Sequence, residues 1–164
     1  MTKVKRFFLE IKKEQYLNQA PTFPEKTEVY LDKKKDININ KFFYRQIGKD
    51  HFWRDRLLWS DKKWQEYVNN INLNTGVIKI ENKLIGFYEQ EFHVEKNEIE
   101  LIQMGILKEY QGKKFGSFLL EYIIHRAFIE NVKRVWVHTC SLDHKYALDN
   151  YLSKGFKIFK KETI

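Results

Sequence analysis

Glu100-Leu-Ile-Gln-Met-Gly-Ile-Leu-Lys-Glu-Tyr-Gln-Gly-Lys-Lys-Phe-Gly116 is the most informative stretch of the sequence for the fold. An apolar run from Ser117 to Phe128 follows it directly. The pattern predicts a strand, a short turn, a glycine-bearing loop and then a helix. Backbone N–H groups are unpaired at the start of a helix, and the helix dipole is positive there. We therefore expect a phosphate-bearing ligand to bind at about Gln111 to Ser117. The loop matches neither the Walker nor the dinucleotide-binding pattern, so by itself it also fits a plain turn.

The composition indicates one domain with a sizeable core. The chain has 164 residues, of which 43% are hydrophobic and 16% aromatic, and two independent domains of this length are disfavoured. The net charge of +8 would attract phosphates, nucleic acid or an anionic membrane. No dense basic block occurs beyond Lys33–Lys35, which favours charge that only solubilises the protein. We expect neither a nucleic acid nor a membrane as partner.

The cysteine content and the termini indicate a cytoplasmic protein. Cys140 is the single cysteine, so no disulfide can form within the chain, as is typical of a reducing compartment. The basic N-terminus has too short an apolar run for a signal peptide, and no stretch approaches the ~20 apolar residues of a membrane helix.

The first half of the chain predicts a strand and two helices. Residues 6–11 are β-prone, and residues 18–28 hold both prolines and form a loop. Asn40 is placed to cap a helix that ends near Gly48. Ser60-Asp61 is placed to start an amphipathic helix. The residues of its apolar side recur at helical spacing: Trp64, Tyr67, Val68 and Ile71.

The second half predicts a meander, a crossover helix and a C-terminal helix and strand. Strands at 77–80, 84–92 and 99–107 are joined by short turns and should be antiparallel. A helix over 112–131 leads to a strand at 134–139, which should run parallel to strand 99–107. A last helix, capped by Asp143 and ended by Gly155, precedes a strand at 156–161. The expected fold class is α/β (α+β): residues 1–164 form a single domain, with helices flanking a mixed sheet.

Two segments resemble the signatures of the GCN5-related N-acetyltransferases. Gln111 and Gly116 fit the ends of the family's pyrophosphate loop, whereas Lys114 stands where the middle glycine usually is. In the C-terminal signature Ala147, Tyr151, Gly155 and Phe156 match at the right spacing, with His144 at an asparagine position and Asn150 at a leucine position. The resemblance covers roughly residues 77 to 161, and it implies a sheet whose two parallel strands splay apart.

The resemblance implies transfer of an acetyl group from acetyl-CoA, as co-substrate, to an amine by direct attack. Tyr151 stands at the family's general acid, although it also fits a helix residue packed on the core. Glu100 stands where some members keep a glutamate base, although its alternation with Ile99 and Leu101 also fits an outward strand position. Glu89 and His138 are lesser candidates for the base.

The resemblance also implies a set of cofactor contacts. The pantetheine arm would meet the backbone of Met104, Gly105, Ile106 and Leu107, where a bulge at Gly105 would open a slot between the two parallel strands. The pyrophosphate would be held by the loop residues Gln111, Gly112, Lys113, Lys114, Phe115, Gly116 and Ser117. Lys114 either places its side chain at the cofactor or holds an ordinary backbone conformation. His144 would replace the usual asparagine at the cofactor.

The acceptor side is expected from residues 40–71 and the meander. Trp53, Arg54, Arg56 and Trp59 combine aromatic faces with guanidinium groups that suit a carboxylate or a phosphate, and Glu89 and His138 would complete this wall. Each of these residues also fits plain helix packing. Cys140 as a nucleophile is disfavoured, and the spacing of His138, Cys140, Asp143 and His144 matches no zinc pattern, so we expect no metal.

Three functions remain open at this stage. The first is a cytoplasmic N-acetyltransferase that acts on a small-molecule amine, as a monomer or homodimer. The runner-up acceptor is a protein or peptide amine. The third is a catalytically inert acyl-CoA-binding module, which the lysine in the loop keeps open and the retained Tyr151 disfavours.

Overall fold

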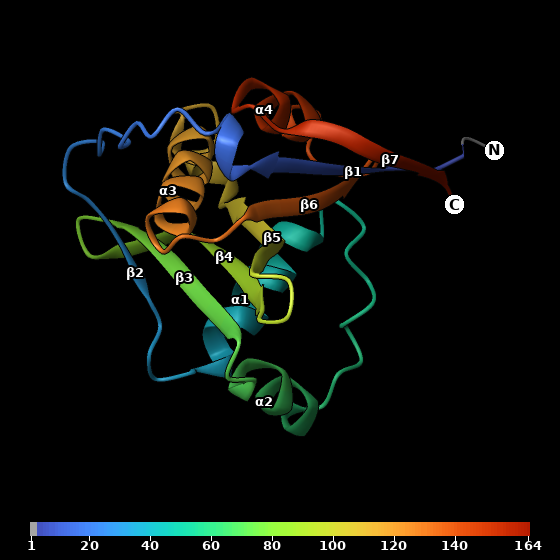
Figure 1. Ribbon diagram of the computed structural model, residues 1–164. Helices are drawn as coiled ribbons and strands as arrows, with labels where there is room; N and C mark the ends of the chain where they lie inside the picture. The colour runs from blue at the N-terminus through green and yellow to red at the C-terminus, as the bar shows by residue number, and fades with distance from the viewer. Residues whose placement is uncertain (1–2) are drawn as a thin grey trace.

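The computed structural model describes residues 3–164 and shows a mixed α/β single domain (Figure 1). Its strands are β1 (Lys5–Lys12), β2 (Thr27–Leu31), β3 (Leu73–Ile80), β4 (Lys83–His93), β5 (Glu98–Ile106), β6 (Arg134–Cys140) and β7 (Lys157–Thr163). Its α-helices are α1 (Ile37–Gly48), α2 (Asp61–Asn69), α3 (Phe115–Ile129) and α4 (Ala147–Ser153), with short 3-10 turns at Lys13–Gln15 and Lys108–Tyr110. The predicted fold class is confirmed.

The strands form one seven-stranded sheet in the order β2-β3-β4-β5-β6-β1-β7. The predicted meander is confirmed, since β3, β4 and β5 are antiparallel neighbours. The predicted crossover is also confirmed, since β5 and β6 are parallel. The N-terminal strand β1 lies between β6 and β7 and is antiparallel to both. Its position was not predicted, because strand propensity does not specify a partner.

The helices cover the sheet on opposite faces (Figure 1). Ile78 and Tyr88 point to the side of α3 and α4, where the larger core cluster lies. Val77 and Phe87, one residue away on each strand, point to the side of α1. This alternation follows from the two-residue period of a strand. Helices on both faces thus bury the centre of the sheet.

The starts of α1 and α4 differ from the prediction. Asp36, not Asn40, caps α1, and its side chain accepts a hydrogen bond from the Asn38 amide. Asn40 is buried one turn inside the helix, where its side chain meets Thr75 and Glu89. Asp143 does not cap α4, which begins at residue 147. Short polar residues favour both caps and buried hydrogen bonds, so their sequence position alone does not separate the two.

Four further helix ends test the sequence predictions. Ser60 caps α2 as predicted and accepts from the Lys63 amide. That helix ends at Asn69, so Ile71 lies outside it with 89% of its surface exposed. Gly155 follows α4 with φ of +100°, the left-handed conformation predicted for a residue after a helix. Helix α3 begins at Phe115 rather than at Gly112.

A buried ionic network joins α1, α2 and the segment between them to β4. The Glu89 carboxylate is fully buried and meets Arg56 Nη1 at 3.0 Å, Tyr67 Oη at 2.7 Å and Asn40 Nδ2 at 2.7 Å. The Arg56 guanidinium lies over the rings of Tyr44, Trp59, Trp64 and Tyr67, at 4.4 to 5.5 Å from the ring centroids. Pairing and hydrogen bonding offset the large cost of burying these two charges.

Replacement of Glu89 by Gln should lower the free energy of unfolding by about 3–5 kcal/mol, because the Arg56 charge would remain buried without a counter-charge. Urea unfolding measures the change. Asp61→Asn is the matched control, since it removes an exposed ion pair with Lys41, and exposed pairs contribute little to stability. An equal, small effect of both substitutions would contradict a stabilising role for the network.

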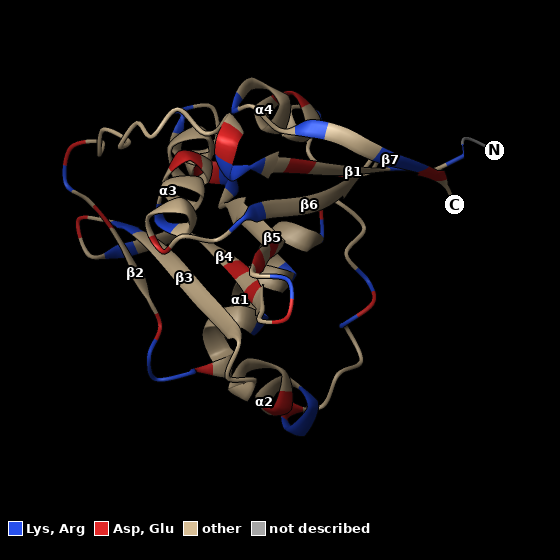
Figure 2. Ribbon diagram, in the orientation of Figure 1, with Lys and Arg blue, Asp and Glu red and all other residues tan. Residues whose placement is uncertain are grey.

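Two general features of the chain are its distribution of charge and the apolar length of its helices. Figure 2 shows basic and acidic segments interspersed over the chain. Within residues 3–164, no helix combines the length and the apolar character needed to cross a membrane.

Candidate active site

Strands β5 and β6 pair only over their first halves. The pairs run from Glu98–Arg134 to Leu101–Val137, and the rest of β5 has no partner on that side. The register of β5 with β4 shifts at the same place: Gln90 pairs with Leu101 and Glu89 with Gln103, so Ile102 is an extra, bulged residue. A bulge bends its strand and increases the local twist, which separates β5 from β6.

The predicted bulge at Gly105 was therefore wrong by three residues. Gly105 pairs in register with Phe87. A Cβ atom at residue 105 would lie 2.8 Å from Cδ1 of Ile47, so this glycine lets α1 approach the strand closely. The sequence indicated a glycine with a structural role, but that role is close packing.

A cavity of about 840 Å³ opens where the two strands separate. It is lined by residues 102–106 of β5, the loop before α3, the end of β6, the segment from Leu142 through α4, and residues 51–55. It brings together the following predicted residues: Met104, Gly105, Ile106, Gln111, Gly112, Lys114, Phe115, Gly116, Ser117, His144, Tyr151, Trp53, Arg54 and His138. A cavity of this size is typical of a small-molecule site.

Six predicted site residues lie outside this cavity. Leu107 packs with the α1 core cluster, and Lys113 extends over the Tyr110 ring. Arg56 and Glu89 are engaged with each other in the buried network, where Trp59 covers the guanidinium. Glu100 lies on the still paired part of β5 and meets His93 Nε2 at 3.0 Å. These six residues do not line the cavity, because spacing along the chain does not specify which face of the structure a residue occupies.

One end of the cavity is rich in free backbone donors. No described residue within 3–164 accepts a hydrogen bond from the amides of Gly112 to Ser117. The Gly112 backbone has φ of +76°, and nothing lies within 4 Å of the position that a Cβ would take, so a ligand has open access. The Gln111 side chain links the loop to β5, since its Nε2 donates a hydrogen bond to the Ile106 carbonyl at 3.0 Å. Free amides at a helix start suit an anion such as a pyrophosphate.

Lys114 adopts the left-handed conformation that its glycine-like position demands, with φ of +69° and ψ of +11°. The alternative of an ordinary backbone conformation was thus wrong. The side chain is exposed at the cavity wall. Left-handed backbone costs a residue with a Cβ roughly 1–2 kcal/mol, so the lysine is retained here at the expense of stability.

Lys114→Gly should raise the free energy of unfolding by about 1 kcal/mol and weaken the binding of a phosphate-bearing ligand. Lys114→Gln separates the two effects, because it removes the charge and keeps the backbone strain. Thermal unfolding and calorimetry measure both quantities. Unchanged stability of the glycine variant would show that residue 114 is not strained.

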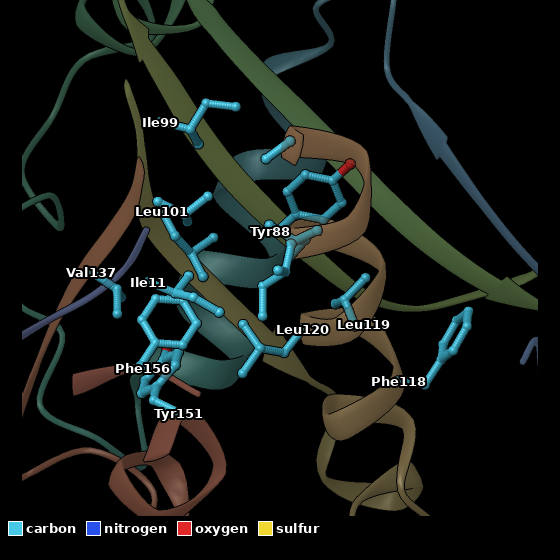
Figure 3. Close-up of a cluster of buried hydrophobic side chains, with 14 of the residues drawn as sticks. Ile11, Tyr88, Ile99, Leu101, Phe118, Leu119, Leu120, Val137, Tyr151 and Phe156 are labelled. Atoms are coloured by element: carbon cyan, nitrogen blue, oxygen red, sulfur yellow. The ribbon is translucent and has the colours of Figure 1, made fainter. Parts of the chain in front are cut away.

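Tyr151 lies on α4 at the inner wall of the cavity, with only 8% of its surface exposed. Figure 3 shows its ring beside Phe156, and the two ring centroids are 5.6 Å apart. Burial raises the pKa of the phenol, and the nearby Asp143 carboxylate raises it further. The hydroxyl therefore stays protonated at neutral pH and is available as a proton donor.

His138 lines the cavity from β6. Burial lowers the pKa of its imidazole, and the positive charge of Arg6 lowers this pKa further. The ring packs beside Phe8, with centroids 5.6 Å apart. A lowered pKa leaves the imidazole neutral at pH 7 and able to accept a proton.

Several residues of the wall were not assigned to the site from the sequence, among them Asp143, Arg6 and Gln103. Asp143 joins its two sides, because it accepts hydrogen bonds from Thr139 Oγ1, from the Cys140 amide at 3.0 Å and from Trp53 Nε1 at 3.4 Å. Arg6 comes from the N-terminal strand, and Gln103 from β5 beside the bulge. Only the placement of β1 between β6 and β7 brings Arg6 here, and no local signal in the sequence indicates it.

The family comparison agrees with this geometry. Residues 37–156 match the model of the acetyltransferase (GNAT) family. The chain therefore belongs to the GNAT family, whose members are acetyltransferases that use acetyl-CoA. None of the curated proteins matches this sequence.

Solved structures support the same fold. A GCN5-related N-acetyltransferase from Sphaerobacter thermophilus is 11% identical with a TM-score of 0.73, over 99% of this chain and 51% of that one. An aminoglycoside acetyltransferase from an uncultured soil metagenomic sample is 16% identical with a TM-score of 0.67, over 82% and 90%. The ribosomal-protein-S18-alanine N-acetyltransferase from Escherichia coli is 16% identical with a TM-score of 0.62, over 79% and 76%.

The length of these proteins varies. The chain spans 51% of the Sphaerobacter protein and 60% of another matching structure. At these identities the similarity establishes the fold and leaves the acceptor open.

Proposed function

We propose that this protein transfers the acetyl group of acetyl-CoA to the primary amine of a small molecule. The observation that carries the proposal is one cavity with free loop amides at one end and a buried tyrosine hydroxyl at its wall. The amides of Gly112 to Ser117 suit the pyrophosphate. The unpaired side of residues 102–106 suits the amide groups of the pantetheine arm. The thioester supplies the acetyl carbonyl carbon, which the amine attacks directly.

The acid of the reaction is assigned to Tyr151. As the C–S bond breaks, the sulfur takes up negative charge, and a neutral phenol is suited to donate its proton there. Because burial raises its pKa, the phenol does not ionise near neutral pH. The retained hydroxyl favours an enzyme over an inert acyl-CoA-binding module.

The base is assigned to His138 in place of Glu100 and Glu89. An amine at neutral pH is mostly an ammonium ion and must lose a proton before it attacks. His138 lines the cavity with a lowered pKa. Glu100 lies outside the cavity, and Glu89 is paired with Arg56.

The acceptor wall favours a substrate with a carboxylate or a phosphate besides its amine. Arg54 lies over the Phe52 ring at 5.1 Å and has no carboxylate partner among residues 3–164. Within the described part of the chain, Arg6 has one acidic partner, Glu162, at 3.7 Å. Guanidinium groups with free donors bind such anions well. A protein or peptide amine is the alternative acceptor.

Acetyl-CoA titrated by calorimetry should bind at one site per chain, and a panel of pooled amines and amino acids should then release free thiol. Absence of acetyl-CoA binding would overturn the proposal. Binding without turnover of small amines, but with acetylation of peptides, would move the acceptor to the protein class. Binding without either activity would indicate an inert module.

Tyr151→Phe should lower kcat by roughly 10²- to 10⁴-fold, the usual contribution of a general acid, while acetyl-CoA still binds. Thiol release under saturating substrates measures kcat, and calorimetry measures the binding. Tyr30→Phe, on the edge strand β2, is the matched control for loss of a hydroxyl. Undiminished kcat in the Tyr151 variant would remove the acid assignment.

His138→Gln should change the pH profile of kcat/KM. With its lowered pKa, His138 is deprotonated from about pH 6.5 upward, so the wild type should show a plateau from there to the pKa of the acceptor amine. The variant should instead rise tenfold per pH unit over that range, because only the free amine then reacts. An unchanged plateau would contradict the base assignment.

A further inference from the structure

Three potential metal ligands meet on the β4–β5 hairpin, outside the cavity. Glu91 and Glu100 are direct partners across the two strands, so their side chains stand on the same face of the sheet. His93 follows two residues after Glu91 and points to that face as well. One ligand atom from each residue lies within 4.8 Å of the other two, and all three side chains are partly buried. The hairpin thus gathers one nitrogen and two oxygen donors.

The charges at this cluster are not balanced by neighbouring cations. Like charges directly opposite each other across two strands are destabilising. Arg134 is committed elsewhere, since it meets Glu10 at 2.9 Å and Glu98 at 3.0 Å. Among residues 3–164, Glu91 has no ion-pair partner, and Glu100 has only His93. Figure 2 shows acidic segments on β4 and β5.

The imidazole is held in a fixed orientation. The indole of Trp136 stacks on the His93 ring, with centroids 6.2 Å apart and planes inclined by 22°. Trp136 is itself the partner of Glu100 across β5 and β6. His93 Nε2 lies 3.0 Å from Glu100 Oε1. Ligand atoms around a tetrahedral Zn²⁺ are about 3.3 Å apart, because each bond is about 2.0 Å long, so small side-chain rotations suffice.

We infer that Glu91, His93 and Glu100 bind a divalent transition-metal ion such as Zn²⁺. One imidazole and two carboxylates form a donor set typical of such ions, and a divalent cation would neutralise both opposed carboxylates. No local pattern in the sequence indicates this site, because its ligands come from two strands and follow no recognised spacing. The site is independent of the acetyl-transfer proposal, since none of its ligands lines the cavity.

The position of the site indicates how a bound ion would affect the sheet. Glu100 is two residues before the bulged Ile102, or about 7 Å along the strand. A bound ion would tie β4 to β5 beside the point where β5 leaves β6. Because the ion binds the folded chain, it should raise the free energy of unfolding by an amount that grows with the logarithm of the ratio of ion concentration to Kd.

The test is metal binding by the tag-free, chelator-stripped protein. ZnCl₂ titrated by calorimetry should bind with one site per chain and raise the melting temperature. Co²⁺ should give visible absorption bands that Zn²⁺ abolishes. Glu91→Gln and His93→Gln should each weaken Zn²⁺ binding by at least about tenfold, since loss even of a group that only orients a metal ligand costs about 10- to 100-fold. Glu95→Gln, in the exposed turn of the same hairpin, should leave the affinity unchanged.

Two results would overturn the inference. Absence of saturable Zn²⁺ binding and of Co²⁺ bands would show that the cluster is only an ion pair of His93 with Glu100. Binding that survives Glu91→Gln and His93→Gln but is lost in His138→Gln or His144→Gln would place the ion in the cavity instead. Circular dichroism of each variant confirms that the hairpin variants remain folded.

Discussion

The site depends on one constraint, the end of pairing between the parallel strands β5 and β6 after Leu101 and Val137. The bulged Ile102 turns β5 away from β6 at that point. Backbone groups inside a protein need hydrogen-bond partners, so a sheet that opens in its middle is favourable only if water or a ligand fills the opening. The cavity of about 840 Å³ is the direct consequence. The loop from Gln111 to Ser117, Tyr151 and His138 all lie around this opening.

A second interaction, the buried ion pair of Glu89 with Arg56, positions the segment that forms the outer wall of the cavity. The buried pair of Glu89 and Arg56 fixes the segment between α1 and α2 against the sheet. Trp53, three residues before Arg56, then reaches Asp143 across the cavity. Arg56 and Glu89 were expected from the sequence to contact the substrate. In the structure they instead fix the segment that forms the wall of the cavity. Removal of either charge should therefore affect stability first and catalysis only through the loosened segment.

The fold and the loop were predictable because they depend on local patterns. Alternation and turn residues indicated the strands of the meander, and Gly155 indicated the end of the last helix. The bulge at Ile102 was not predictable, because Gly105 offers the stronger local signal for one. The network of Glu89 was also hidden, since its partners lie on three distant segments. Contacts between segments depend on register and packing, which a single sequence does not specify.

The most direct measurement is a crystal structure of the protein with bound CoA. The proposal predicts the pyrophosphate on the amides of Gly112 to Ser117, the pantetheine arm along residues 102–106, and the sulfur within hydrogen-bond distance of the Tyr151 hydroxyl. CoA bound elsewhere, or with its sulfur remote from Tyr151, would contradict the assignment of this cavity to acetyl transfer.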